Sequence, residues 1–376
     1  MTVELTWDQA LAWRVDRHHL AARRRATDPV ALVGELGGVQ AQVLPSAKQV
    51  IGIRSDATPE MVERLLWTER RLVKTWAMRG TLHLLPSDEL DLWAAVLRTR
   101  ETRITPGWEK YHGVTGAELH AITDAVPGAL DDEPITRDEL AGRIAARLRQ
   151  PRLAEVLRSG WAAVLKPAAN QGLLVQGPPV GGNVTFVDPS RWLGRPITAA
   201  DPHASMATVV DRFLDVNGPA THEDLARWLG VQPKQARQII GEHADRVEAV
   251  SVDGPKAWMT ARGAAAAGAV RPKRSVYLLP GFDPYVLAPI SHRRHTIPDG
   301  RIDEVSRRAG WISAVLLVDG RIAGTWTTEP AGTEGGPATV TVTPFVELRD
   351  DVADAAARHL ATRYRHLLGP ATLVVG

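Results

Sequence analysis

The spacing of apolar and polar residues predicts helices in the first part of the chain. Thr6 and Gln9 form a capping box, and Leu11, Val15 and Leu20 follow it at the spacing of one helix face. A second helix is predicted where a threonine cap is followed by proline, which is favoured at the first helical position. It begins at Thr58-Pro59-Glu60 and carries Met61, Leu65 and Leu66.

Two short strands follow these helices. Residues 72–76 and 81–85 are rich in β-branched and apolar residues, and they flank Met78-Arg79-Gly80. Helices followed by a hairpin are the order of a winged helix. The order is repeated, with a capping box at Thr136, an apolar helix through Val156, Trp161 and Val164, and strands at 172–176 and 184–187 joined by the Gly- and Pro-rich residues 177–182.

The third repeat is the clearest. Gly230 ends a capped helix, and the next helix presents Lys234, Gln235 and Arg237, which is the layout that places a helix in the major groove of DNA. Winged helices also serve as protein-interaction modules, so both roles stay open for this repeat. Its predicted elements are helices at 206–216, at 221–229 and from 232, and strands at 247–252 and 256–260 on either side of Asp253-Gly254-Pro255.

After Pro272 the pattern changes to strands. Asp319-Gly320 is a hairpin signal between two of them, and a last helix covers residues 350–367. The strands are predicted at 275–279, 311–318, 321–327 and 339–344. The predicted fold class is α+β, with tandem winged-helix units and a C-terminal antiparallel β sheet or barrel. The predicted domains are a first winged helix at 1–110, a second at 111–200, a third at 201–270, and a β-rich domain with a basic loop at 271–376.

Composition narrows the classes of function. The sequence contains no cysteine, which excludes thiolate zinc sites, iron–sulfur clusters, disulfides and a cysteine nucleophile. No cofactor is implied. The sequence has neither a basic leader followed by an apolar run nor any stretch of about 18 apolar residues, so we expect a cytoplasmic protein with no membrane partner.

Basic residues are clustered although the formal net charge is only +2. Arginine is the side chain best shaped to bind phosphate through two nitrogens, but charge runs on helices are also commonly solvated faces. His292 and His295 have a spacing that a metal could use, but no third ligand is evident, so no metal site is predicted. The clusters are Arg14, Arg17, His18, His19, Arg23, Arg24 and Arg25; Arg98, Arg100 and Arg103; and Arg271, Lys273, Arg274, His292, Arg293, Arg294 and His295.

Gln40 and Gln42 are the most informative polar residues, because they end an apolar helix pattern where a core would normally require apolar side chains. A primary amide has no useful pKa and cannot act as a general acid or base. It can donate and accept hydrogen bonds together and so fix a water molecule. A pair of amides suits a reaction whose leaving group is already activated. The alternative is that both are ordinary polar residues at a helix end or in a loop.

Four motifs in register resemble the AlkZ/YcaQ family of winged-helix DNA glycosylases, over nearly the whole chain. They are Val39-Gln40-Ala41-Gln42 and residues 75–83, 278–287 and 318–326. In that family, tandem winged helices form a C-shaped channel for duplex DNA, and a Gln-X-Gln or Gln-X-Asp motif in the first unit is catalytic. Gln42 puts the chain with the Gln-X-Gln branch, which removes bulky antibiotic adducts or unhooks interstrand crosslinks, often as self-resistance in antibiotic producers.

The resemblance implies a monofunctional DNA glycosylase that hydrolyses the N-glycosidic bond of N7-alkylated purines. Alkylation at N7 makes the purine cationic, and its departure then resembles glycoside hydrolysis through an oxocarbenium-like sugar. Our hypothesis is that Gln40 and Gln42 hold a water beside C1′. No lysine nucleophile is implied, although Lys48 and Lys74 are the nearest lysines in sequence. The predicted partner is double-stranded DNA containing alkylated purines, bound by a monomer at the nucleoid.

The predicted DNA contacts are His292, Arg293, Arg294 and His295, with Arg79 and His83 as further candidates. Arg79 could instead pair with a core carboxylate, and a histidine on a strand is more commonly a buried, satisfied residue. The competing class of function is a non-catalytic winged-helix transcription regulator. A hydrolase with Asp283 as nucleophile is a weaker alternative, because Phe282-Asp283-Pro284 has the composition of a turn.

Overall fold

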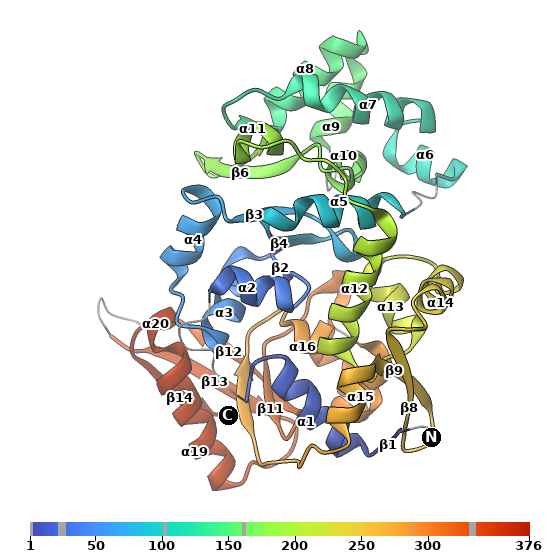
Figure 1. The fold of residues 1–376 in the computed structure, drawn as a ribbon. Coiled ribbons are helices and arrows are strands. Elements are labelled where there is room, and N and C mark those ends of the chain that lie inside the picture. The colour runs from blue at the N-terminus through green and yellow to red at the C-terminus, as the bar shows by residue number, and fades with distance from the viewer. Residues whose placement is uncertain (1–2, 22–27, 101–103, 160–162, 288, 331–335) are drawn as a thin grey trace. The chain divides into compact units, whose positions relative to one another are not determined.

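The computed structural model describes residues 3–21, 28–100, 104–159, 163–287, 289–330 and 336–376 (Figure 1). The chain forms two compact units, in which unit 1 contains Met1–Val62 and Val210–Gly376, and unit 2 contains Glu63–Val209. A compact unit can contain more than one winged helix, so the four predicted segments stay a prediction. The predicted positions that lie outside the described residues are Trp161, Arg23, Arg24, Arg25 and Arg103.

Capping signals located two of the first four helices correctly. In α1 (Trp7–Arg17) the Thr6 hydroxyl accepts a hydrogen bond from the Gln9 amide, and the Gln9 side chain accepts one from the Thr6 amide. The predicted Pro59 is the first residue of α4 (Pro59–Trp67), in which the chain passes into unit 2. Between them lie α2 (Pro29–Glu35) and α3 (Leu44–Arg54).

The third predicted repeat has the predicted order of helices and strands. Gly230 is in the left-handed region with φ of 80° and ends the second helix as its C-cap. The elements are α12 (Pro202–Asn217), in which the chain returns to unit 1, α13 (His222–Leu229), α14 (Pro233–Glu242), β8 (Val247–Val252), β9 (Lys256–Thr260) and α15 (Ala261–Ala267).

A strand that the sequence did not predict extends this hairpin. β1 (Val3–Leu5) pairs in parallel with β8, so that Val3 lies opposite Val250 and Leu5 opposite Val252. Three residues are too short a run to show alternation, which is why the pattern missed it. The first strand of the chain therefore belongs to the same sheet as residues about 250 positions away.

The C-terminal sheet is mixed, which corrects the prediction of an antiparallel sheet. Its strands, in spatial order, are β10 (Val276–Leu279), β11 (Val315–Val318), β12 (Arg321–Glu329), β13 (Ala338–Pro344) and β14 (Ala371–Val375). The first four are antiparallel neighbours, with Asp319 and Gly320 at positive φ in the predicted turn. β14 pairs in parallel with β13, because a helical connection returns the chain in the same direction.

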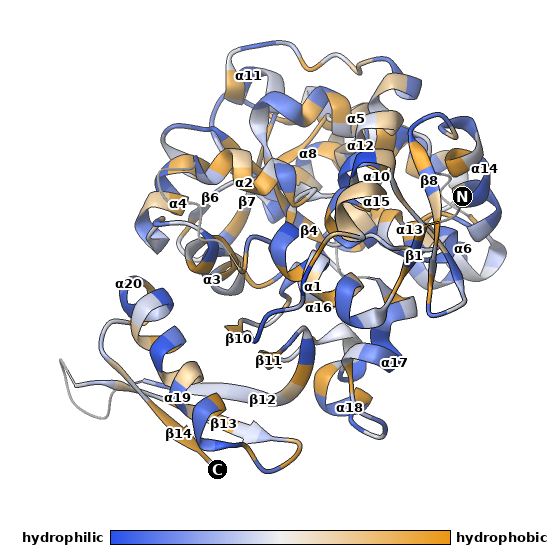
Figure 2. Ribbon diagram, turned by 60° about the horizontal axis from the view of Figure 1, so that its bottom comes forward, coloured by the Kyte–Doolittle hydropathy of each residue, from blue (hydrophilic) through white to orange (hydrophobic). Residues whose placement is uncertain are grey.

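The connection between β13 and β14 contains the helix predicted at residues 350–367, interrupted once by a π-helical turn. α19 (Asp350–His359) and α20 (Arg365–Leu368) are joined by a π-helical turn at Leu360–Tyr364. Figure 2 shows both hydrophilic and hydrophobic residues on α19, as expected for a helix with one face on a sheet. The buried Tyr364 hydroxyl donates a hydrogen bond of 3.0 Å to the Leu278 carbonyl, which ties this turn to β10.

Short helices occupy the rest of the C-terminal region. They are α16 (Pro284–Leu287), α17 (Arg293–Thr296) and α18 (Ile302–Val305).

In unit 2, the two predicted hairpins share one sheet. β3 (Leu72–Trp76) pairs with β4 (Leu82–Pro86) on one side and with β6 (Val175–Val180) on the other. Beyond β6, the next strand in the sheet is β7 (Asn183–Val187), and β5 (Ile135–Thr136) pairs with β7. The helices of this unit are α5 (Leu90–Arg98), α6 (Pro106–His112), α7 (Gly116–Ala129), α8 (Arg137–Leu148), α9 (Arg152–Arg158), α10 (Lys166–Asn170) and α11 (Pro189–Leu193). One hydrophobic core combines strand residues Trp76 and Leu82 of the first predicted repeat with strand and helix residues of the second.

The second hairpin differs from its prediction. The strand continues through Pro178 and Pro179, and the register shifts between Gly177 and Val180, where a bulge accommodates residues that cannot donate a ladder hydrogen bond. The turn is therefore shorter than residues 177–182. No helix in the described part of the chain has the length and apolar character needed to cross a bilayer.

The buried His359 is expected to make the stability of the protein depend on pH. Its Nδ1 accepts a 3.3 Å hydrogen bond from the Leu278 amide, and burial lowers its pKa to about 3. Because the folded pKa lies below the ordinary value of 6.5, the unfolded chain binds an extra proton between these values, and stability falls as the pH falls through this window. We expect His359→Asn to remove about 1.4 kcal/mol per pH unit of this dependence, measured by urea unfolding at several pH values. The same slope in His359→Asn as in the wild type would contradict this origin, and exposed His120→Asn is the control.

Candidate functional site

The two predicted catalytic amides lie in different environments of unit 1. Gln40 ends β2 (Val39–Gln40) and is buried, with 6% of its surface exposed, whereas Gln42 is exposed just before α3. Gly37 and Gly38 precede them with φ of 69° and 95°, conformations that other residues adopt only with strain. Gln40 is therefore fixed by the protein, while Gln42 is open to solvent.

The segment before the amides packs closely against the third repeat. A side-chain carbon at Gly37 would lie 3.1 Å from Cζ2 of Trp228 on α13. Positive φ and this close approach both favour glycine at position 37. The turn that delivers Gln40 is thus held in place by an indole ring from a distant part of the chain.

The other end of α3 is fixed by a buried ion pair. Both Arg54 and Asp283 are 0% exposed, and the guanidinium Nη1 and Nη2 each donate a hydrogen bond of 2.8 Å to a different carboxylate oxygen. Arg54 Nε also donates to the His18 carbonyl at 2.7 Å, and Asp283 accepts from the Tyr285 amide at 2.9 Å. These contacts give Asp283 a structural role and argue against a nucleophile at this position.

His292 also has a structural role, in place of the predicted DNA contact. It is 2% exposed, and its Nε2 donates a hydrogen bond of 2.5 Å to the Pro219 carbonyl. Nδ1 is then left as an acceptor for Arg14 Nη1 at 3.2 Å. Burial and then the neighbouring Arg14 hold the pKa of His292 well below its ordinary value. A neutral, fully bonded imidazole is not available to DNA.

The residues after His292 are more accessible. Arg294 is exposed, and its Nε donates a hydrogen bond of 3.0 Å to His295 Nε2. The His295 ring stacks on Trp7 with centroids 3.7 Å apart and planes at 14°. Arg293 is half-buried, and its pKa is lowered by burial and then by Arg227. Arg293, Arg294 and His295 stay candidate DNA contacts.

Asp224 connects this basic segment to the third repeat, and the sequence did not identify this role. Its carboxylate completes the capping box of α13 with Thr221, and it is 1% exposed. The same carboxylate accepts hydrogen bonds from the Ser291 amide at 2.9 Å and the Ser291 hydroxyl at 2.5 Å. A capping box signalled only the local contact, because a sequence pattern does not reveal partners far along the chain.

Arg79 and His83 lie in unit 2 around the turn between β3 and β4. Arg79 is half-buried and has a left-handed φ of 56°. His83 is 2% exposed, its Nδ1 donates a hydrogen bond of 2.9 Å to the Thr81 carbonyl, and its pKa is lowered to about 3 by burial and then by Arg79. His83 is thus the buried, satisfied histidine that was the alternative interpretation, and Arg79 stays a candidate contact.

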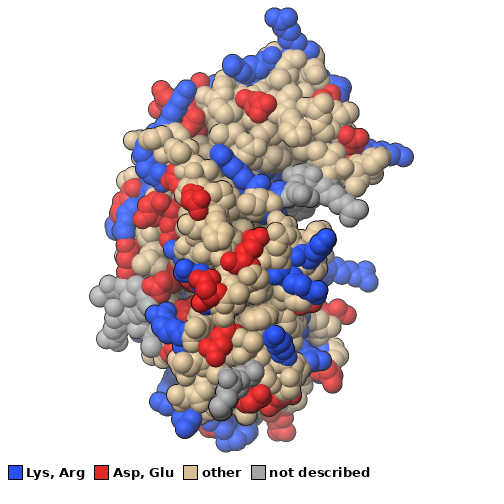
Figure 3. Space-filling view, turned by 45° about the vertical axis from the view of Figure 1, so that its right-hand side comes forward, with Lys and Arg blue, Asp and Glu red and all other residues tan. Residues whose placement is uncertain are grey.

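The basic cluster of the first helix turns inward, contrary to the expectation of a phosphate-binding or solvated face. Arg14, His18 and His19 are buried, with 1%, 0% and 7% exposed. Arg17 is paired with Asp215 of α12. Figure 3 shows Lys and Arg side chains interspersed with Asp and Glu over one face of the molecule, so charge on this face is mixed.

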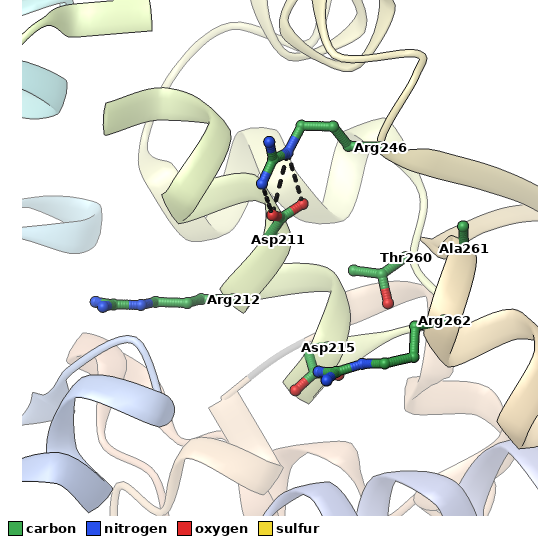
Figure 4. A pocket seen from close by; sticks show the side chains of 7 residues that line it. All are labelled: Asp211, Arg212, Asp215, Arg246, Thr260, Ala261 and Arg262. Atoms are coloured by element: carbon green, nitrogen blue, oxygen red, sulfur yellow. Dashed lines mark hydrogen bonds and ion pairs between the residues drawn. The ribbon is translucent and has the colours of Figure 1, made fainter. Parts of the chain in front are cut away.

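A pocket of about 400 Å³ lies beside α12, but its charges are largely matched (Figure 4). Arg246 is paired with Asp211, and Arg262 lies 3.9 Å from Asp215, while Arg212 points away from both pairs. Matched charges leave little net attraction for an anion. The pocket therefore gives no support for a substrate site.

The two lysines nearest in sequence to the amides lie in different units of the structure. Lys48 lies on α3, whereas Lys74 lies on β3 of unit 2, where burial lowers its pKa. Among the described residues no group of three His, Asp or Glu side chains could hold a metal ion. Both nitrogens of His292 already contact protein atoms.

Comparison with protein-family models places the chain among the DNA glycosylases. The family model for AlkZ-like DNA glycosylases matches residues 33–362, and the chain belongs to this family, which confirms the resemblance seen in the motifs. The chain is 38% identical over 332 residues to the interstrand DNA cross-link repair glycosylase of Streptomyces sahachiroi, covering 86% of this chain and 88% of that protein. It is also similar to the solved structure of Streptomyces sahachiroi DNA glycosylase AlkZ, with a TM-score of 0.88 and 34% identity over 99% of this chain and 100% of that one.

Proposed function

We propose that this protein is a monofunctional DNA glycosylase that repairs bulky or crosslinking N7-alkylated purines in duplex DNA. The observation that carries the proposal is the Gln40-Ala41-Gln42 segment, within a chain of this family. One relative is named for interstrand cross-link repair, which supports a crosslinked or bulky adduct as substrate. Self-resistance to a DNA-alkylating antibiotic is the physiological role that fits such a substrate.

The chemistry follows from the charge of the damaged base. An N7-alkylated purine is already cationic, so its departure does not need protonation by a carboxylic acid. Gln40, fixed by the protein, and Gln42, open to solvent, together hold a water beside C1′, and their carbonyl dipoles stabilise the developing sugar cation. Positioning and fixed dipoles of this kind supply on the order of 10²-fold in rate or more.

We further propose that the helix and strand repeats are winged helices that bind the duplex. The third repeat supports this interpretation, because α13, α14 and the β8–β9 hairpin follow the order of helix-turn-helix and wing. Arg293, Arg294 and His295 are then contacts to the backbone or a groove, and Asp224 fixes the segment that carries them. Arg79 is a further contact from unit 2.

Product analysis tests the function. Duplex DNA alkylated at guanine N7 is incubated with the protein, and we expect release of free alkylated base and strand cleavage only after alkali. A monofunctional enzyme forms no Schiff base, so borohydride should trap no covalent complex with Lys48, Lys74 or any other lysine. Trapping with intact base release would refute the monofunctional assignment. Sequence-specific binding to one operator with no released base would support the regulator instead.

A further inference from the structure

Two cationic side chains converge on the turn between β3 and β4 in unit 2. Arg100 Nη1 donates a hydrogen bond of 2.8 Å to the Ala77 carbonyl, which fixes the guanidinium at the start of the turn. A side-chain carbon at Gly80 would lie 3.5 Å from Lys166 Nζ and 3.9 Å from Arg100 Nη2. Arg100 follows α5 and Lys166 begins α10, so separate elements bring two positive charges to one point.

The two cations are half-buried, and within the described part of the chain neither has an ion pair. The only hydrogen bond of Arg100 there is to a carbonyl, and its Nε is buried without a partner. Burial lowers the pKa of Lys166, and Arg100 lowers it further. Bringing like charges together out of water is unfavourable unless an anion is bound between them.

The surroundings suit a phosphate oxygen. Arg79 lies in the same turn, and Tyr111 on α6 is 83% exposed. The His112 ring lies 4.9 Å from the Tyr111 ring, and the pKa of His112 is lowered by burial and then by Lys166, so α6 lies near Lys166. Arginine, lysine and tyrosine are the side chains that commonly contact the DNA backbone.

We propose that Arg100 and Lys166 bind one backbone phosphate of duplex DNA at the Gly80 turn. This inference rests on the proposed function, in which duplex DNA is the substrate. A phosphodiester carries one negative charge and several acceptor lone pairs, so it accepts hydrogen bonds from both cations and offsets their repulsion. The pocket beside α12 differs in that aspartates already neutralise two of its arginines.

The salt dependence of binding tests this site. Binding of an unmodified duplex is measured by fluorescence anisotropy over a range of salt concentrations. In R100Q/K166Q we expect the slope of log K against log salt to become shallower by about 1, with about 10-fold weaker binding near 0.1 M salt. Each single variant should lose less than the double variant loses, because the remaining cation still contacts the phosphate. R100K/K166R should restore most of the affinity.

R147Q is the control for the single variants, since it also removes one charge, from an exposed arginine on α8 whose hydrogen bond is to the Gly128 carbonyl. A double variant that folds and keeps the wild-type slope would overturn the proposal, as would a failure of R100K/K166R to restore binding when its melting temperature is unchanged. Base release by the wild type is measured separately. If no base is released but the double variant still flattens the slope, the glycosylase function fails and the phosphate site stands. If base is released and the double variant behaves like R147Q, only the phosphate site fails.

Discussion

Replacing Gln40 or Gln42 by alanine should reduce base release from N7-alkylated duplex DNA by on the order of 10²-fold or more in single-turnover assays. Each change removes an amide that positions the attacking water and a dipole that faces the developing sugar cation. Binding of the duplex should change little, because neither side chain carries a charge. Since amides do not titrate, the wild-type rate should also vary little between about pH 6 and pH 8.

Conservative variants separate chemistry from packing at these two positions. Gln40 is buried, so Gln40→Glu, which keeps the size of the side chain, tests the amide without creating a cavity. Gln42 is exposed, so Gln42→Ala should leave the melting temperature nearly unchanged. Wild-type excision by both alanine variants would refute the catalytic assignment. Loss of excision together with loss of folding in all Gln40 variants would give that residue a structural role only.

Asp283→Asn should destabilise the protein by about 3–5 kcal/mol, the usual cost of leaving one charge of a buried pair without its partner. The amide keeps the shape of the carboxylate but cannot accept both guanidinium hydrogen bonds, so Arg54 stays buried with its charge uncompensated. The measurement is urea or thermal unfolding followed by tryptophan fluorescence. A loss of excision in this variant should follow the unfolded fraction.

An exposed pair provides the comparison for Asp283→Asn. Arg301 and Glu304 are 2.7 Å apart and about 40% exposed, so Glu304→Gln should cost less than about 1 kcal/mol. Equal small effects of both changes would show that the buried pair does not hold α3. A stable Asp283→Asn variant without excision would instead return Asp283 to consideration as a catalytic residue.

Local signals in the sequence predicted most of the helices and hairpins. Capping boxes at Thr6, Thr136 and Thr221 marked helix starts correctly, because the capping contacts are made within four residues of sequence. The Asp319-Gly320 turn was equally local, since both residues adopt the positive φ that the hairpin requires. The family was predicted from a different signal, the order of four motifs along the chain, and the match of the family model confirmed it.

Burial of charged residues was the main failure of the sequence interpretation. Arg14, His18 and His292 belong to basic clusters that suggested a DNA-binding surface, yet all three are buried. Arg14 on α1 contacts His292, which lies far away in sequence. β1 was missed because it is too short to show alternation, and both β1 and β14 form as strands only by pairing in parallel with residues elsewhere in the chain. The setting of Gln40 also depends on a contact between distant residues, that of Gly37 with Trp228, which no local pattern reveals.

The pairing of β1 with β8 has a consequence for biosynthesis. At roughly 5–20 residues per second, the ribosome needs tens of seconds after making Val3 to produce Val250, its neighbour in the sheet. Within that interval, once Val209 has been made, Glu63–Val209 is complete as a contiguous stretch of nascent chain, whereas unit 1 still lacks Val210–Gly376. Unit 2 can therefore fold first during translation. The N-terminal part of unit 1 must wait until Val210–Gly376, the rest of the same unit, has been synthesised.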